Sequence, residues 1–253
     1  RGDVEVTAGP SIQLYTLREQ LEADLPGTLD ALAARGFTEV EPFRFPERAK
    51  EYRPALAASG LSTPTLHGRL LTEGVDPLRV LDAAAEFGPA TVVEPLVAAE
   101  RWASADGVRR TADALNELSS HAAARGLSLA YHNHWWETEY RVDGMVALEY
   151  LADHLDPAVG LELDVYWALV GGVDPVALAK RLGDRVIALH VKDGALGKDG
   201  SGQSALGTGA VPVVEALRAA PRARRVLELD FFDGDVWEPI DDGLEFLRRH
   251  DAR

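Results

Sequence analysis

The chain has 253 residues, of which 46% are hydrophobic, so it can bury the core of one large domain or of two small ones. Its formal net charge is −15 and it has no basic tract, which argues against a nucleic-acid partner because such a surface repels phosphate backbones. Cysteine is absent, which excludes disulfides and thiolate metal sites, so any bound metal must be held by histidine and carboxylates.

Short segments of β-forming residues alternate eight times with longer segments rich in Ala, Leu, Glu and Arg. Strands are predicted at 11–16, 37–43, 62–67, 90–96, 127–134, 159–167, 186–192 and 225–231. Helices are predicted near 19–35, 47–59, 76–87, 106–125, 143–154, 174–182, 211–219 and 241–250. Alternation of this kind predicts a parallel sheet, and eight repeats match a closed (β/α)8 TIM barrel.

Helix boundaries carry their own signals. Aspartate–proline pairs are typical of helix or turn starts, and they occur at Asp76-Pro77, Asp156-Pro157 and Asp174-Pro175. Glycines suit the left-handed conformation that often ends a helix, and they stand at positions 36, 60, 88, 126 and 183.

An open, doubly wound sheet is the alternative architecture. No Gly-x-Gly-x-x-Gly motif follows any predicted strand, which weighs against it. The later glycines fall in 195–210, which we interpret as a mobile segment at the rim of the barrel. No linker or change of composition divides the chain, so we predict one domain over 1–253, with 1–10 as a disordered or irregular extension.

Polar side chains gather at the ends of the predicted strands. Alternate residues of a strand share a face, so the apolar residues face the helices and the polar ones face the barrel axis. The axis-facing polar residues are Gln13, Tyr15, Glu41, His67, Glu94, His132, His134, Glu162, Asp164, His190, Lys192, Glu228 and Asp230. They should converge at the carboxyl end of the barrel, where such barrels place their active sites.

Six motifs, in order along the chain, carry a family resemblance. They are Ser11-Ile-Gln-Leu-Tyr-Thr-Leu-Arg18, Tyr131-His-Asn-His134 with Glu137, Leu163-Asp-Val-Tyr-Trp167, His190-Val-Lys-Asp193, Ala205-Leu-Gly-Thr-Gly209 and Leu227-Glu-Leu-Asp230. In these the chain resembles the sugar phosphate isomerase/epimerase family of the xylose isomerase-like TIM barrel superfamily, which has inosose dehydratase-like and 3-keto-glycoside-processing relatives. The resemblance extends from Ser11 to the last helix.

The resemblance implies one divalent metal ion, Mn²⁺, Co²⁺, Mg²⁺ or Zn²⁺, at the ends of the last four strands. Asp164, His190 and Glu228 match the family's ligands on the sixth, seventh and eighth strands. Relatives commonly have Glu as the fifth-strand ligand, whereas this chain has His132 there, with Glu137 as the rival. Thr208 also departs from the family, since many relatives carry Glu at that place.

The chemistry expected at such a site is proton transfer next to a carbonyl. A metal acting as a Lewis acid lowers the barrier to forming an enediolate, and a side chain then removes and returns the proton. We expect Glu137, His134 and Glu228 to be the catalytic groups. We expect Gln13, Tyr15, His67, Lys192 and Trp167 to bind the substrate.

The leading hypothesis is therefore a metal-dependent isomerase or epimerase of a small keto-sugar or polyol. A lyase or dehydratase of the inosose dehydratase or 3-keto-glycoside type is the first alternative. Endonucleases acting at abasic DNA sites share the superfamily and would recruit Glu94 and Glu162 as extra ligands, but the acidic surface disfavours them. A barrel that binds sugars without turning them over is the remaining alternative.

The expected partners are few. No apolar stretch approaches the roughly 20 residues that span a bilayer, and no signal peptide is visible, so we expect no membrane partner and a cytoplasmic location. We expect a small sugar or polyol as the substrate, no nucleic acid, and a possible homodimer.

Overall fold

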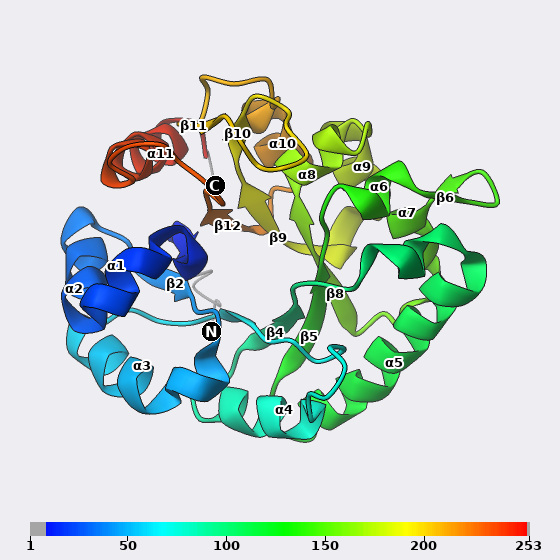
Figure 1. Ribbon diagram of the computed structural model, residues 1–253, viewed down its shortest axis with the longest axis horizontal. Helices are drawn as coiled ribbons and strands as arrows, with labels where there is room; N and C mark the ends of the chain where they lie inside the picture. Colours follow the sequence, from blue (N-terminus) through cyan, green and yellow to red (C-terminus); the bar gives the residue numbers. More distant parts are fainter. Residues whose placement is uncertain (1–8, 252–253) are drawn as a thin grey trace, which may run out of the picture.

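The computed structural model describes residues 9–251, so all of the predicted extension at 1–10 except residues 9 and 10 lies outside the described part. Eight parallel strands form a barrel surrounded by helices (Figure 1), as the sequence predicted. The strands are β1 (Ser11–Gln13), β2 (Glu39–Glu41), β3 (Thr65–His67), β4 (Thr91–Glu94), β5 (Ser128–His132), β8 (Val159–Asp164), β9 (Val186–Val191) and β12 (Arg224–Leu227).

Strand pairing runs in the order β2-β1-β12-β9-β8-β5-β4-β3. The ring is nearly closed between its two ends, where the backbone N–H of Val40 donates to Ser62 at 2.9 Å and that of His67 to Pro42 at 2.9 Å. Every strand therefore points its carboxyl end to the same side of the molecule.

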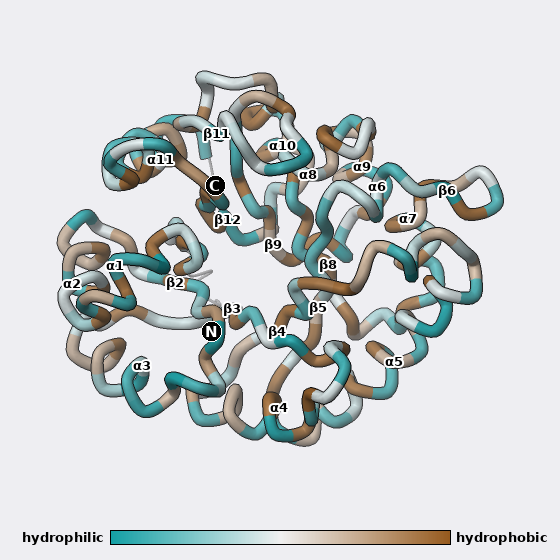
Figure 2. The backbone as a smooth tube through the Cα atoms, viewed as in Figure 1, coloured by the Kyte–Doolittle hydropathy of each residue, from teal (hydrophilic) through white to brown (hydrophobic). Residues whose placement is uncertain are grey.

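Helices follow the strands in turn and form the outer layer. They are α1 (Arg18–Ala23), α2 (Leu25–Arg35), α3 (Phe45–Ser59), α4 (Pro77–Ala85), α5 (Ala105–Ala123), α6 (Trp136–Glu139), α7 (Ala147–His154), α8 (Val165–Val170), α9 (Pro175–Leu182), α10 (Val213–Ala219) and α11 (Trp237–His250). The backbone coloured by hydropathy alternates between teal and brown along them (Figure 2), as expected for helices with one face on the barrel. Among residues 9–251, no helix combines the length and apolar character that crossing a bilayer requires.

The predicted helix starts are confirmed where aspartate precedes proline. The side chain of Asp76 accepts the N–H of Leu78 at 3.1 Å, and that of Asp174 accepts the N–H of Val176 at 2.9 Å. Asp156-Pro157 leads into a turn. All five glycines predicted to end helices have positive φ, from 56° at Gly183 to 96° at Gly88.

All eight predicted strands are longer than the observed ones, and three further differences stand out. The helix expected from residue 143 begins at Ala147, because a hairpin of β6 (Arg141–Val142) and β7 (Met145–Val146) precedes it. Its turn, Asp143-Gly144, has φ of 52° and 82°, the positive pair that a tight hairpin turn requires. The strand predicted to end at 167 ends at Asp164, whose side chain accepts the N–H of Trp167 at 2.8 Å and starts α8.

The third difference is the rim segment 195–210, where β10 (Asp193–Gly194) pairs with β11 (Gln203–Ser204) in an antiparallel hairpin. The buried carboxylate of Asp193 accepts the backbone N–H groups of Gly207, Gly209 and Val211 at 2.9 to 3.0 Å. These hydrogen bonds attach the segment to the carboxyl end of the barrel.

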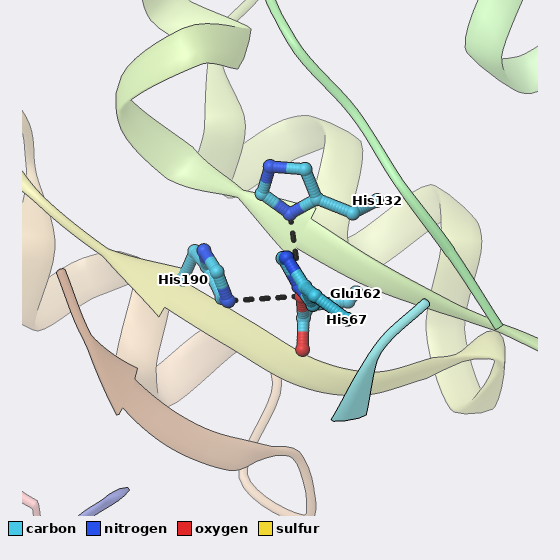
Figure 3. Close-up of side chains that lie close together, drawn as sticks. All are labelled: His67, His132, Glu162 and His190. Atoms are coloured by element: carbon cyan, nitrogen blue, oxygen red, sulfur yellow. Dashed lines mark hydrogen bonds and ion pairs between the residues drawn. The ribbon is translucent and has the colours of Figure 1, made fainter. Parts of the chain in front are cut away.

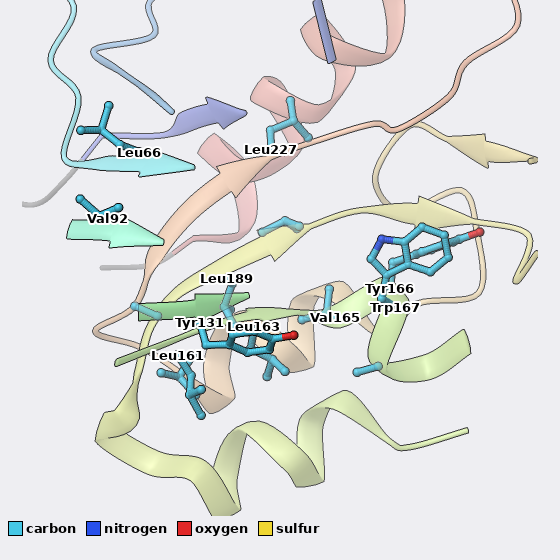
Figure 4. Close-up of a cluster of buried hydrophobic side chains, with 14 of the residues drawn as sticks. Leu66, Val92, Tyr131, Leu161, Leu163, Val165, Tyr166, Trp167, Leu189 and Leu227 are labelled. Carbon is cyan, nitrogen blue, oxygen red and sulfur yellow. The ribbon is translucent and has the colours of Figure 1, made fainter. Parts of the chain in front are cut away.

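The apolar core lies between the barrel and its helices. Leu66, Val92, Leu161, Leu189 and Leu227 are at most 1% exposed and form part of the cluster drawn in Figure 4. Since adjacent residues of a strand face opposite ways, this packing turns the intervening polar side chains toward the barrel axis. Strand parity thus sets which side chains meet at the site.

Candidate active site

Side chains from six strands meet at the carboxyl end of the barrel. A cluster that we call the inner group consists of His67, His132, Glu162 and His190, from β3, β5, β8 and β9 (Figure 3). Glu162 Oε1 lies 2.7 Å from His67 Nε2, 2.9 Å from His190 Nε2 and 3.3 Å from His132 Nδ1. Three imidazoles therefore converge on one carboxylate oxygen.

Glu41 of β2 lies beside the inner group. Its Oε1 is 2.7 Å from His190 Nε2 and 3.0 Å from His67 Nε2, and it accepts a hydrogen bond from Gln13 Nε2 at 2.7 Å. Gln13 is fully buried and is the register partner of Glu41 on the neighbouring strand β1, so it positions Glu41 from the side.

Burial and neighbouring charges set the protonation of these groups. Burial opposes charge on His67, but Glu41 and Glu162 raise its pKa to about 10. Burial likewise opposes charge on His190, but Glu162, Glu228 and Glu41 raise its pKa well above the usual value. The pKa of His132 is lowered by its own burial and by the neighbouring His190, so this imidazole is neutral at neutral pH.

A second cluster, the outer group, consists of Asp164, His190 and Glu228. His190 belongs to both clusters, since its Nδ1 is 2.7 Å from Glu228 Oε2 while its Nε2 faces the inner group. The ammonium of Lys192 lies among the acids of this side, 2.6 Å from Glu228 Oε2, 2.9 Å from Asp164 Oδ2 and 2.8 Å from Asp230 Oδ2.

The same neighbours control the charges of the outer group. Burial raises the pKa of Asp164 to about 6, with Lys192 and His190 opposing the shift. Burial works in the same direction on Glu228, but Lys192 and His190 outweigh it and hold the pKa of Glu228 below its usual value. Lys192 stays charged because Asp164, Asp230 and Glu228 raise its pKa despite its burial.

His134 follows β5 and faces the cavity. Its ring stacks on Trp136 with centroids 4.6 Å apart and lies 6.1 Å from the ring of Trp167. Burial and the charge of Lys192 lower the pKa of His134 to about 3, so the imidazole is neutral at neutral pH. Its buried Nδ1 has no hydrogen-bond partner among residues 9–251.

Glu137, in α6, lies behind His134. Its Oε1 accepts the hydroxyl of Tyr131 at 2.5 Å, and its Oε2 accepts the backbone N–H of His134 at 2.8 Å. Burial raises the pKa of Glu137 to about 8. Both oxygens thus hold the turn after β5, and the parts expected of Glu137 in metal binding and proton transfer stay predictions.

A cavity of about 420 Å³ opens above the two groups, within the size range of small-molecule sites. Its lining residues are Tyr15, Phe43, Arg44, Pro46, Glu47, His67, Arg69, Val75, Val80, Pro95, Leu96, His132, His134, Glu228 and Asp230. Of the residues expected to bind substrate, Tyr15 and His67 line it directly. Trp167 packs beside Lys192, whose Nζ is 5.5 Å from the ring centroid.

Sequence reasoning placed some site residues and missed others. Glu41 and Glu162 were expected on the axis-facing side, but neither was expected to be a metal ligand of a sugar isomerase. Arg44 and Arg69 were missed altogether, because they follow strands in loops for which no periodic pattern predicts a direction. Glu94 does not join the cluster, since its carboxylate accepts the backbone N–H groups of Leu70, Leu71 and Leu96.

The donor set fits a divalent metal ion. Six-coordinate bonds of roughly 2.1 Å put neighbouring ligand atoms roughly 3.0 Å apart, and the nitrogen–oxygen distances around Glu162 Oε1 are 2.7 to 3.3 Å. Five buried atoms of the two groups and their neighbours have no hydrogen-bond partner within the described chain: Glu41 Oε2, His132 Nδ1, His134 Nδ1, Glu162 Oε2 and Asp164 Oδ2. Buried polar atoms are seldom left so, and a bound cation would satisfy them.

Comparisons with known proteins agree with the fold. The family model described as xylose isomerase-like TIM barrel matches residues 29–250. A curated relative from Actinoplanes sp., a 2-epi-5-epi-valiolone 7-phosphate 2-epimerase, is 31% identical over 206 residues, which cover 75% of this chain and 73% of the relative.

Solved structures match over almost the whole chain. A sugar phosphate isomerase/epimerase from Parabacteroides distasonis matches with a TM-score of 0.80 at 23% identity, covering 99% of this chain and 96% of its own. A probable 3-DHS dehydratase from Bacillus anthracis matches with a TM-score of 0.72 at 13% identity, covering 95% of this chain and 98% of its own. At these identities the matches establish the shared barrel fold.

Proposed function

Because the chain belongs to the xylose isomerase-like TIM barrel family, we propose that it is a divalent-metal-dependent isomerase or epimerase of a small keto-sugar or polyol. The observation that carries the proposal is the convergence of three imidazoles, two of them buried, on Glu162 beneath a cavity of about 420 Å³. Relatives named as an epimerase and as an isomerase/epimerase support the same class of reaction.

The metal ion would be Mn²⁺, Co²⁺, Mg²⁺ or Zn²⁺. The histidines His132 and His190, with the carboxylates of the inner or the outer group, would hold it. When bound, the ion would supply Lewis acidity. It would polarise a carbonyl and an adjacent hydroxyl, which makes the proton on the hydroxyl-bearing carbon next to the carbonyl easier to remove.

Two side chains are suited to move that proton. The carboxylate of Glu228 lines the cavity and stays ionised beside Lys192 and His190, so it can accept a proton there, with a basicity that this pairing lowers. The neutral imidazole of His134 lines the same cavity from the end of β5. Since β8 and β9 separate β5 from β12 in the barrel, the two groups approach a bound sugar from different sides. That arrangement suits epimerisation, in which one face loses a proton and the other gains one.

The remaining charged groups would bind and orient the substrate. Lys192 holds Glu228 and Asp230 in place through contacts of 2.6 and 2.8 Å, which leaves both carboxylates at the cavity wall. Tyr15 and Phe43 form an edge-to-face pair with ring centroids 5.3 Å apart. They supply an apolar wall for the face of a sugar ring that presents its C–H groups.

A phosphate on the substrate would meet Arg44 and Arg69 at the cavity. Both guanidinium groups are exposed and make no ion pair within the described residues, which is notable in a chain of net charge −15. Arg44 adopts a left-handed conformation with φ of 49°, an uncommon one for a residue with a side chain and often associated with functional sites. The curated relative is named for a phosphorylated substrate, so we include phosphorylated keto-sugars and cyclitols in the proposed substrate class.

The test is a panel of keto-sugars, inososes and their phosphates incubated in D₂O with the metal-reconstituted protein and followed by NMR. We expect solvent deuterium at the carbon next to the carbonyl, together with an isomer or epimer of the starting compound. Elimination of water would identify the lyase alternative instead. Binding of these compounds without any deuterium exchange would contradict the proposal and favour a sugar-binding barrel.

A further inference from the structure

We propose that the metal ion is held by the inner group, His67, His132, Glu162 and His190, and that Lys192 keeps the outer group closed to it. This inference deepens the proposed function by locating its metal. It differs from the ligand set Asp164, His190, Glu228 and His132 that the family resemblance implies, because two of those carboxylates are already engaged by a lysine.

In the outer group, the ammonium of Lys192 occupies the position where a cation would bind. Asp164 Oδ2 and Glu228 Oε2 lie 2.9 and 2.6 Å from Lys192 Nζ, so both oxygens face its charge, although Asp164 Oδ2 makes no hydrogen bond within the described residues. An ion bound to both oxygens would lie within a few ångströms of a buried ammonium, and two like charges at that distance repel strongly in a low-dielectric site. The ammonium already pairs with both of these acids.

The inner group has the opposite character. Within the described residues, no lysine or arginine lies within ion-pair distance of Glu41 or Glu162, and imidazoles are their ion-pair partners. The Oε2 atoms of both carboxylates are buried and lack hydrogen bonds, as is the Nδ1 of His132. These atoms offer a cation the contacts that the protein itself leaves unmade.

His190 connects the two groups in a way that favours the inner one. A neutral imidazole offers one lone pair, so His190 can ligate through Nε2 toward the inner group or through Nδ1 toward the outer group. With Nε2 as the ligand, Nδ1–H donates to Glu228 Oε2 at 2.7 Å, the carboxylate–histidine–metal arrangement common in metal sites. Glu228 thereby orients His190 and stays available at the cavity wall.

The donor set also narrows the choice of metal. Three imidazoles and one carboxylate suit Zn²⁺ or Co²⁺, whereas Mg²⁺ prefers oxygen ligands. His67 and His132 line the cavity, so a metal ion at the inner group would be accessible to a bound substrate from that side. We therefore expect the protein to bind Zn²⁺ and Co²⁺ in clear preference to Mg²⁺.

A matched pair of variants distinguishes metal binding at the inner group from metal binding at the outer group, without any substrate. His67 belongs to the inner group alone and Asp164 to the outer group alone. Zn²⁺ affinity is measured by competition with a chromophoric chelator, and metal content by elemental analysis after gel filtration. We expect His67→Gln to weaken Zn²⁺ binding by at least about 100-fold. A residue that only hydrogen-bonds to a metal ligand usually changes the affinity by less than that. Asp164→Asn should retain about one ion per chain with affinity within about tenfold of wild type.

Retention of the ion by His67→Gln, or its loss from Asp164→Asn, would overturn the proposal, and so would a wild-type protein that binds no Zn²⁺. Circular dichroism identifies a variant that fails to fold. A readout on the unaltered protein then decides the matter: pulsed EPR of the Cu²⁺-loaded wild type should detect three coordinated imidazoles. One imidazole, which the outer group would supply through His190, or two, which the family's ligand set would supply through His132 and His190, would overturn the proposal.

Failure of this proposal is distinguishable from failure of the proposed function. Three coordinated imidazoles without deuterium exchange would support the metal site at the inner group and contradict the proposed isomerase or epimerase activity. Deuterium exchange by a protein whose metal has fewer than three imidazole ligands would support the proposed activity and contradict the metal site at the inner group.

Discussion

Both ends of the barrel bury charged side chains, but they treat them differently. At the amino end, Arg225 is 1% exposed and its guanidinium donates to the carbonyls of Leu217, Ala220 and Ala223 at 2.5 to 3.0 Å and to Asp251 at 3.2 Å. At the carboxyl end, Glu162 is fully buried, and its second oxygen has no hydrogen-bond partner among the described residues.

The difference separates a structural charge from a functional one. A buried charge whose hydrogen-bonding capacity is filled stabilises the fold around it. A buried charge with unused hydrogen-bonding capacity lowers the stability of the fold. Such a residue is retained where a ligand or a reaction uses its charge. Burial alone therefore does not mark the active site of this barrel, whereas incomplete pairing does.

The largest expected effect is on catalysis at the carboxyl end. Glu162→Gln removes the charge on which three imidazoles converge, so we expect turnover to fall by about 10²- to 10⁴-fold. The melting temperature should fall only modestly, because the variant loses the contacts of Oε1 with His67 and His190 but also the cost of burying a charge whose Oε2 is unpaired. The exposed Glu117→Gln in α5 is the control and should alter neither property. A large loss of stability in Glu162→Gln with normal turnover would reverse the assignment.

The opposite result is expected at the amino end. Arg225→Met leaves several buried carbonyls without donors, so the free energy of unfolding should fall by about 2–4 kcal/mol. Turnover per folded molecule at low temperature should be normal. Urea unfolding measures the change, with Arg222→Met as the control. Arg222 pairs with Asp184 in solvent, where such pairs contribute at most about 1 kcal/mol. Equal losses in the two variants would contradict the distinction between buried and exposed arginines.

Glu94 tests the same distinction through pH. It ends β4 near the site, but three backbone N–H groups occupy its oxygens, so it should act as a structural charge. Burial raises its pKa to about 7, opposed by those three N–H groups and by Arg69. The folded state then binds more protons than the unfolded state between pH 4.5 and about 7.

The contribution of Glu94 to stability is therefore complete below pH 4.5 and is lost as the pH rises to about 7. The loss amounts to about 3 kcal/mol for a shift of this size. Urea unfolding of wild type and Glu94→Gln across this pH range measures the difference between the two slopes. Parallel slopes would show that Glu94 titrates normally.

The smallest expected effect lies in the outer layer. Asp76→Ala removes the side chain that accepts the N–H of Leu78 at the start of α4, which should cost about 1 kcal/mol of stability and leave turnover unchanged. Thermal unfolding and a turnover assay on the same sample check both statements. Altered turnover would mean that α4, which contributes Val80 to the cavity, transmits changes to the site.

The fold was predictable because its signals are local. Strand–helix alternation, aspartate caps such as Asp76 and glycine at helix ends such as Gly88 each depend on a few neighbouring residues. The hairpin at Asp143-Gly144 carried a recognisable turn pair but was read as the start of a helix. Strand parity also placed Glu41 and Glu162 on the axis-facing side.

The partners across the barrel were not predictable. His67 and Glu162 are 95 positions apart, and their 2.7 Å contact depends on how eight strands tilt and close. Lys192 was expected to touch substrate, and its position between Asp164 and Glu228 depends on how β8, β9 and β12 pack side by side. Arg44 and Arg69 reach the cavity from loops, whose direction only tertiary packing sets.

Anomalous diffraction at the zinc absorption edge, from crystals of the Zn²⁺-loaded protein, tests the central claim most directly. We expect one strong peak within bonding distance, roughly 2.0–2.2 Å, of His67 Nε2, His132 Nδ1, His190 Nε2 and a Glu162 oxygen. A peak between Asp164 and Glu228 with Lys192 displaced, or no peak at the carboxyl end of the barrel, would contradict it.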